Sequence, residues 1–168
     1  MIKDGQIALR SIGEGDLEFL FLLYASTREP EKAMVGWPDE QWDQFMRMQF
    51  SLQHDQYMKN YENPSFDVIL VNGVLAGRLY VNRKADDCRL IDIALLPEFH
   101  GRGIAGSLIG LLLQEADEKG TPVSLHVEKN NPVRDYYLRL GFEVAEDKGV
   151  YDFMVRPVGG KDHRLGAV

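Results

Sequence analysis

The sequence predicts an α/β fold built on a mixed, largely antiparallel sheet, and two observations carry that prediction. Two strand-like segments are joined by Asn72-Gly73, a dipeptide suited to the positive φ values of a two-residue hairpin turn. Further along, IDIALLPEFHGRGIAGS (91–107) passes from an apolar strand through a glycine-rich turn into an apolar helix. The hairpin requires antiparallel strands, and the strand-turn-helix unit adds the helical layer.

Hydrophobic spacing predicts the remaining elements in order. Strands are expected where apolar residues alternate or run together, at Ile7 to Arg10, Phe66 to Val71, Val74 to Val81, Arg89 to Leu96, Val123 to Val127, Phe142 to Ala145 and Val150 to Val155. Helices are expected at Leu17 to Ser26, Pro38 to Tyr61, from the glycine turn to Lys119, and at Pro132 to Leu140. Asp16 is placed to cap the first helix, and Gly120 to end the third. The segment from Thr27 to Trp37 is predicted as a loop or a broken helix.

The long helix has an unusual face. Acidic residues in its first turn suit the positive end of a helix dipole. Its broad inner face is predicted to mix apolar and polar side chains, namely Trp42, Phe45, Met46, Gln49, Leu52, Gln53 and Gln56. Polar residues therefore interrupt the surface expected to meet the sheet.

Length and composition predict a single domain with its own core: 168 residues with 45% hydrophobic content fit one domain, 1–156, followed by a disordered tail, 157–168. A net charge of −7 argues against general affinity for nucleic acid or anionic membranes and favours amine-bearing partners.

A single cysteine, Cys88, and the lack of an apolar signal core predict a cytoplasmic protein. His54 has no second ligand at helical spacing, so no metal site is expected.

The glycine turn predicts a phosphate cradle. Gly101, Gly103 and Gly106 leave the backbone open to a ligand, and the free N–H groups of the following helix attract an anion by about 0.3–1 kcal/mol. These glycines also spell the dinucleotide fingerprint GxGxxG. That interpretation is disfavoured because four residues separate strand from glycines, Arg102 lies inside the turn, and the unit follows antiparallel hairpins. A turn that merely joins strand to helix is the other alternative.

Two motifs in order resemble the GCN5-related N-acetyltransferases. The family's first motif is Arg or Gln, two residues, Gly, one residue, then Gly or Ala, and His100, Gly103 and Ala105 occupy those places after Pro97-Glu98. Downstream, NNPVRDYYLRLGFEV (130–144) is similar to the family's second block. The resemblance covers about Phe66 to Val155 and implies the family's acyltransferase fold. His100 departs from the usual Arg or Gln.

The resemblance implies that acetyl-CoA binds here as acetyl donor. Main-chain groups of the strand before the turn would pair with the pantetheine arm, because the family splays this strand from the next one. Backbone amides of the turn and the helix start would hold the pyrophosphate. The cofactor-binding residues implied in this way are Ile93, Ala94, Leu95, His100, Gly101, Arg102, Gly103, Ile104, Ala105, Gly106, Ser107, Asn131 and Tyr137.

Acetyl transfer to a primary amine requires a base, an oxyanion donor and an acid. By resemblance, the Leu95 amide is the donor and Tyr137 the acid, since a tyrosine of pKa near 10 stays protonated at pH 7. Tyr136 points about 100° away and is expected in the core. The base is left open between His126, Asp92, a residue on the long helix and no dedicated side chain.

Substrate contacts are expected from the least family-like segment, Thr27 to Tyr61, because loops and short helices beside a sheet usually carry specificity. The candidates are Arg28, Trp37, Gln49 and Gln53. The predicted function is direct acetyl transfer to a small-molecule or peptide amine, and a non-catalytic acetyl-CoA-binding or sensing domain is the alternative. An exposed sheet edge would allow a homodimer.

Overall fold

The computed structural model describes residues 6–160, and residues 161–168 of the predicted tail lie outside this range. The first residues of that tail are included, and there the Gly159 amide donates to Asp117 Oδ1 at 2.8 Å. The chain forms two compact units. Unit 1 contains the described residues 6–80 and 92–105, and unit 2 contains 81–91 and 106–160.

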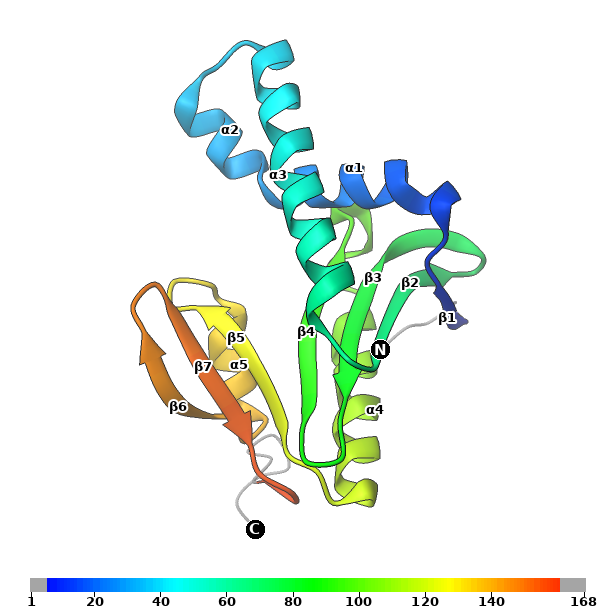
Figure 1. The fold of residues 1–168 in the computed structure, drawn as a ribbon, viewed down its shortest axis with the longest axis vertical. Helices are drawn as coiled ribbons and strands as arrows, with labels where there is room; N and C mark the ends of the chain where they lie inside the picture. The colour runs from blue at the N-terminus through cyan, green and yellow to red at the C-terminus, as the bar shows by residue number, and fades with distance from the viewer. Residues whose placement is uncertain (1–5, 161–168) are drawn as a thin grey trace. The chain divides into compact units, whose positions relative to one another are not determined.

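The described residues form a mixed sheet with helices on its faces, as predicted (Figure 1). Its strands follow the order β1-β2-β3-β4-β5-β7-β6. Their bounds are β1 Ile7–Ser11, β2 Pro64–Val71, β3 Val74–Arg83, β4 Cys88–Leu95, β5 Val123–Glu128, β6 Glu143–Lys148 and β7 Tyr151–Arg156. The β1–β2, β5–β7 and β6–β7 pairs are antiparallel, whereas β4 and β5 are parallel and register at Cys88↔Val123 and Arg89↔Ser124.

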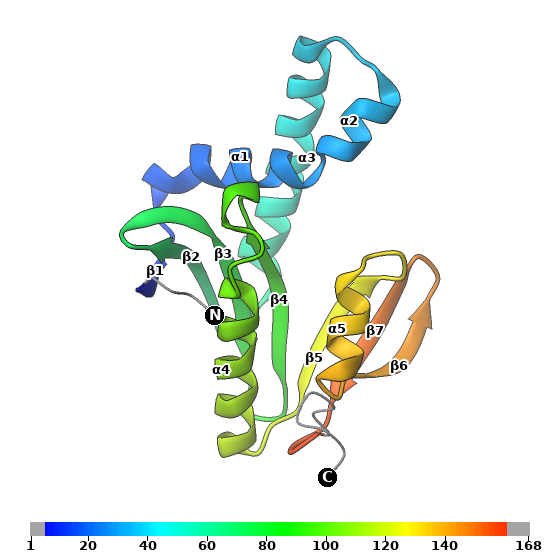
Figure 2. The same cartoon turned by 180° about the vertical axis from the view of Figure 1, so that it is seen from behind.

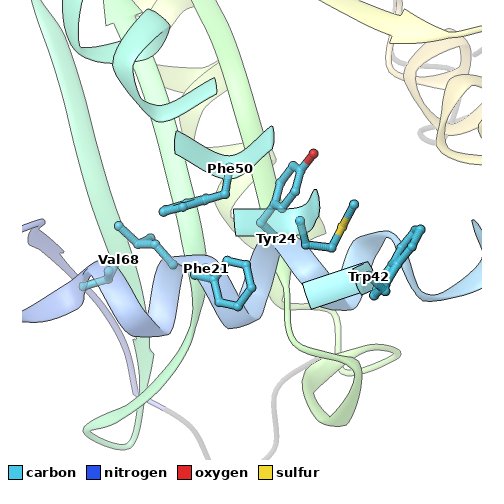
Figure 3. Close-up of a cluster of buried hydrophobic side chains, with 7 residues drawn as sticks. Phe21, Tyr24, Trp42, Phe50 and Val68 are labelled. Carbon is cyan, nitrogen blue, oxygen red and sulfur yellow. The ribbon is translucent and has the colours of Figure 1, made fainter. Parts of the chain in front are cut away.

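Unit 1 has a helical layer of α1 Leu17–Thr27, α2 Glu29–Val35 and α3 Asp39–Asn60. Its core joins α1, α3 and β2 (Figure 3). Phe21 of α1 meets Phe50 of α3 edge-on, with ring centroids 5.9 Å apart, and Val68 of β2 is fully buried beneath them. Burying large aromatic side chains dominates the stability of such a core. The apolar stripes of both helices therefore fix the layer on the sheet.

Unit 2 contains α4 Ile104–Lys119 from its third residue onward, and α5 Val133–Arg139. Figure 2 shows α5 lying across one face of β5 and β7. Leu125 and Val127 of β5 are buried, whereas His126 and Glu128 on the opposite face are exposed. The period-two alternation of β5 thus turns His126 away from the core.

Local predictions are confirmed at the hairpin and revised in two places. Asn72 and Gly73 have φ values of 51° and 79°, as the hairpin turn requires. Asp16 makes no helix cap. Its dihedrals are already helical because it ends the 3₁₀ turn η1 Glu14–Asp16, so its carboxylate points back to the Gly13 amide and Arg10. On α3, Leu52 and Gln56 are exposed, so they do not belong to the inner face on which they were predicted.

Candidate active site

The predicted phosphate turn has the backbone that its glycines require. β4 ends at Leu95, the 3₁₀ turn η2 Pro97–Phe99 follows, and α4 begins at Ile104. Gly101 and Gly103 have φ values of 75° and 78°, in the left-handed region that L side chains rarely adopt. A Cβ at Gly101 would meet nothing within 4 Å, so packing does not explain that glycine. The turn is exposed and its backbone is accessible to a ligand.

His100 is bound to the strand that precedes the turn. Its Nε2 lies 2.8 Å from the Leu95 carbonyl oxygen, where it donates a hydrogen bond if Nε2 carries the proton. Arg102, inside the turn, places its guanidinium over the Phe99 ring at 5.1 Å. The departure from the family's Arg or Gln therefore gives a side chain that anchors the peptide group between Leu95 and Leu96, next to the Leu95 amide that is the predicted oxyanion donor.

Gly77 of β3 is a residue that the sequence analysis missed. A Cβ there would lie 2.1 Å from the Ala94 carbonyl oxygen and 3.0 Å from Leu95 Cα. Only glycine allows β3 this close to the part of β4 that is predicted to contact acetyl-CoA. A glycine inside the strand pattern VLAGRLYV was the available signal, because such glycines mark close backbone approach.

A buried polar cluster lies between β3, β4 and α3. Arg78 is 4% exposed and its Nε donates to Asp92 Oδ2 at 2.5 Å. Its Nη2 donates to Gln53 Oε1 at 3.1 Å, and its guanidinium lies over the Tyr80 ring at 4.8 Å. The structure thus brings together Asp92 and Gln53, two site residues predicted independently, through an arginine that the sequence analysis did not select.

The two tyrosines of α5 have the reverse of the expected burial. Tyr137, expected to face a cleft, is 5% exposed and packs on Phe142 with ring centroids 5.4 Å apart. Tyr136, expected in the core, is half-buried, and its hydroxyl would lie 3.1 Å from a Cβ at Gly106. The Tyr136 hydroxyl of α5 therefore lies close to Gly106, in the first turn of α4.

Asn131 orients α5 from its N-terminal end. Its Oδ1 accepts a hydrogen bond from the Val133 amide at 3.0 Å, and its carbonyl oxygen accepts one from the Arg134 amide at the same distance. A side-chain oxygen at this place satisfies an N–H group that the helix itself leaves unpaired. Asn131 thus sets the start of the helix that carries both tyrosines.

His126 is exposed on β5 and sits beside Phe153, with ring centroids 4.9 Å apart. Partial burial, reinforced by the positive charges of Arg89 and Lys148, lowers the pKa of His126 below its usual value near 6.5. Its imidazole is therefore predominantly neutral at pH 7 and able to accept a proton.

Two of the proposed substrate residues are held by neighbours in unit 1. Arg28 donates to both carboxylate oxygens of Glu31 at 2.7 Å and to the Tyr24 hydroxyl. Trp37 is 37% exposed and meets Phe45 edge-on at 5.4 Å, within an aromatic group that includes Trp42. Gln49 is half-buried one helical turn before Gln53 on α3.

Cys88 and the acidic residues suggest no further chemistry. Burial raises the pKa of the Cys88 thiol to about 11, so it is not a nucleophile at pH 7. Residues 6–160 hold no group of three His, Cys, Asp or Glu side chains arranged for a metal ion. Within the same range, no helix has the length and apolarity needed to cross a bilayer.

The model of the acetyltransferase (GNAT) family matches residues 31–142 of this chain. The chain belongs to the GNAT acetyltransferase family. The match includes the glycine turn and, of the second motif at 130–144, every residue up to Phe142.

One characterised GNAT relative is the ribosomal protein bS18 alanine N-acetyltransferase of Haemophilus influenzae, which is 31% identical over 99 residues. The aligned stretch covers 58% of this chain and 66% of that relative, slightly less than two thirds of its length.

Solved structures share the fold. The PaiA N-acetyltransferase of Thermoplasma acidophilum, crystallised in complex with coenzyme A, has a TM-score of 0.67 and 21% identity, and the match covers 90% of this chain and 99% of that one. The ribosomal-protein-S18-alanine N-acetyltransferase of Escherichia coli has a TM-score of 0.59 and 18% identity, over 91% and 94% of the two chains. These similarities confirm the GNAT fold.

Proposed function

We propose that this GNAT chain is an acetyl-CoA-dependent N-acetyltransferase that moves the acetyl group directly to a primary amine. The observation that carries the proposal is the strand-turn-helix unit from β4 to α4, whose Gly101 and Gly103 adopt positive φ and leave an exposed main chain for phosphate. The inert Cys88 thiol supports direct transfer, because a covalent acyl-enzyme needs a reactive nucleophile.

Each residue has a proposed role. Acetyl-CoA supplies an activated thioester. The amides from Gly101 to Ser107 hold its pyrophosphate, with charge added by Arg102, and the main chain of Ile93–Leu95 pairs with its pantetheine arm. The Leu95 amide donates to the thioester carbonyl oxygen, and the hydrogen bond between His100 and the Leu95 carbonyl holds the adjacent peptide group, between Leu95 and Leu96.

Proton transfer is assigned to two side chains of unit 2. We propose that Tyr137 protonates the departing thiolate, by its place in the family motif. His126 is the better supported base because its imidazole is neutral at pH 7, whereas Asp92 is already paired with Arg78.

The acceptor is proposed to be the α-amine of a peptide or protein. The supporting observation is the 31% identity to an enzyme named for acetylating an alanine of ribosomal protein bS18. An α-amine has a pKa near 7.7–8.0, so it needs less help from a base than a lysine side chain with a pKa near 10.4. A single weakly basic histidine is sufficient for such an acceptor.

The test is acetyl-CoA consumption and thiol release with a panel of amines and peptides. Tyr137→Phe should lower kcat about 100-fold or more while leaving the Kd for CoA unchanged, since general acid catalysis contributes about 10²–10⁴-fold. Tyr136→Phe is the matched control and should retain most activity. Equal loss in both variants would contradict the role of Tyr137.

A non-catalytic acetyl-CoA sensor is the second candidate. The observation that favours it is His100, which occupies the family's Arg or Gln position and is turned toward Leu95. Tight acetyl-CoA binding with no turnover across the whole panel would establish this alternative.

A further inference from the structure

The inner face of α3 carries polar side chains where a helix packed on a sheet normally carries apolar ones. Gln49, Gln53 and Tyr57 recur every four residues and are all half-buried. Figure 1 shows α3 in front of β3 and β4. The Tyr57 ring meets the Tyr80 ring of β3 edge-on at 5.6 Å. This row therefore lies against β3, where Tyr57 packs on Tyr80 and Gln53 accepts a hydrogen bond from Arg78.

Opposite this row lies the buried pair of Arg78 and Asp92. The Arg78 side chain is 5% exposed and that of Asp92 is 27% exposed. A buried ion pair is weak evidence for stability, because well-packed apolar residues are often equally or more stabilising. The same cluster contains the Tyr80 hydroxyl, fully buried and without a hydrogen-bond partner in the described part of the chain. Unsatisfied polar groups are costly unless a ligand or water meets them.

The Arg78 guanidinium orients two side chains, one with a free hydrogen-bond acceptor and one with free donors. Arg78 holds Asp92 through Oδ2 and Gln53 through Oε1, so Asp92, whose side chain is partly exposed, keeps its second carboxylate oxygen and Gln53 keeps its amide N–H groups. The Asp92 oxygen accepts a hydrogen bond from an ammonium, and the Gln53 amide donates one to a carbonyl oxygen. An ammonium with a carbonyl two bonds away is the start of a peptide chain, whereas a lysine side chain lacks that carbonyl.

We infer that Asp92 and Gln53 bind the N-terminal ammonium and the first carbonyl of a peptide acceptor. Arg78 is a positioning residue that fixes both side chains. Because Arg78 neutralises Asp92, the carboxylate orients the amine without strongly raising the amine's pKa, which would oppose its deprotonation. The inference rests on the proposed function and names the acceptor class of its site.

The test uses two peptides and the protein saturated with CoA, so that no turnover is needed. One hexapeptide amide begins with alanine, and its des-amino counterpart carries a propionyl group in place of the alanyl group. Calorimetry on the wild type should show the alanyl peptide binding about 10- to 100-fold more tightly, the range for a hydrogen bond to a charged group. Equal affinities would overturn the inference.

Variants localise the effect. Asp92→Asn should remove the preference for the alanyl peptide, and it should raise the KM for that peptide while leaving the KM for acetyl-CoA unchanged. Because this change leaves Arg78 unpaired, the Arg78→Gln/Asp92→Asn double variant repeats the measurement without a buried lone charge.

Gln53→Leu should weaken the binding of both peptides equally. Asp55→Asn, at an exposed site on α3, is the control. A preference that survives in both Asp92 variants would contradict the inference.

The two proposals fail in different ways. If the wild type acetylates no amine, the proposed function is wrong, but the affinities of the two peptides still test the role of Asp92. If the wild type acetylates peptides but binds both probes equally, the assignment of Asp92 fails alone.

Discussion

Gly77 shows how one missing side chain shapes β4, the strand proposed to contact acetyl-CoA. Its Cα hydrogen faces the Ala94 carbonyl and the Leu95 backbone, where a methyl group would overlap them. The closest contact is backbone to backbone, so neither strand can yield without shifting the other.

Gly77→Ala should therefore destabilise the protein by about 1–3 kcal/mol, the usual cost of overpacking, and should lower activity through the displaced Leu95 amide. Urea unfolding and acetyl transfer measure the two effects. Gly110→Ala, inside α4 with nothing within 4 Å of the added Cβ, is the control and should be neutral or stabilising. Similar behaviour of both variants would contradict the close-approach argument.

His126, the proposed base, is the second position where the surroundings of a single side chain matter. Partial burial first, and then the charges of Arg89 and Lys148, disfavour its imidazolium form. A base must be unprotonated to act, so the fraction of active protein should grow as the pH rises through the lowered pKa of His126.

An NMR titration should place the midpoint of the His126 ring below 6.5, and Lys148→Gln should move it upward because one repelling charge is lost. The acid limb of kcat/KM should shift in the same direction. The signal is assigned with His126→Asn. A midpoint at or above 6.5 in the wild type would show that the neighbours do not act as described.

At the scale of elements, the unit from β4 through η2 to α4 is the part that we propose binds acetyl-CoA. The strand is held by Gly77 and by His100, and the turn then reverses through two glycines in the left-handed region. The helix begins directly after the second of them, so its unpaired N–H groups are available where the turn ends.

Gly101→Ala should cost about 1–2 kcal/mol of stability through its positive φ and should weaken CoA binding about tenfold or more. Gly149→Ala is the matched control: its φ is 84°, and an added Cβ would meet nothing within 4 Å. It should cost similar stability and leave CoA affinity intact. Thermal unfolding and calorimetry with CoA separate the two effects, and equal CoA affinities in both variants would remove the turn from the binding site.

At the scale of the whole molecule, the net charge of −7 shapes encounters with the acceptor more than it shapes the fold. Long-range attraction raises the local concentration of cationic partners and is screened by salt. The charge belongs to the entire chain, so no single substitution removes it.

We expect kcat/KM for a lysine-rich peptide to fall steeply from low to high salt, while that for a neutral peptide with the same first residues changes little. Steady-state kinetics over a salt series measures this. An equal salt dependence for both peptides would indicate that net charge does not steer the acceptor.

The sequence by itself determined the features that depend on near neighbours. The Asn72-Gly73 turn, the glycine turn and the order of strands and helices outside Thr27 to Trp37, where the structure has α2, were predicted because turn geometry and hydrophobic periodicity are local properties. The two GNAT motifs were predicted for the same reason, since each is a short run of fixed spacing.

Tertiary structure alone decided the contacts between distant segments. Whether Asp92 would face a ligand or a partner was open until Arg78, fourteen positions away on another strand, was placed beside it. The burial of Tyr136 and Tyr137 depends on how α5 packs against α4 and Phe142, and the closeness of Gly77 to Ala94 depends on two strands meeting. Helical spacing gives the angle between two side chains, but only packing shows which of them faces the core.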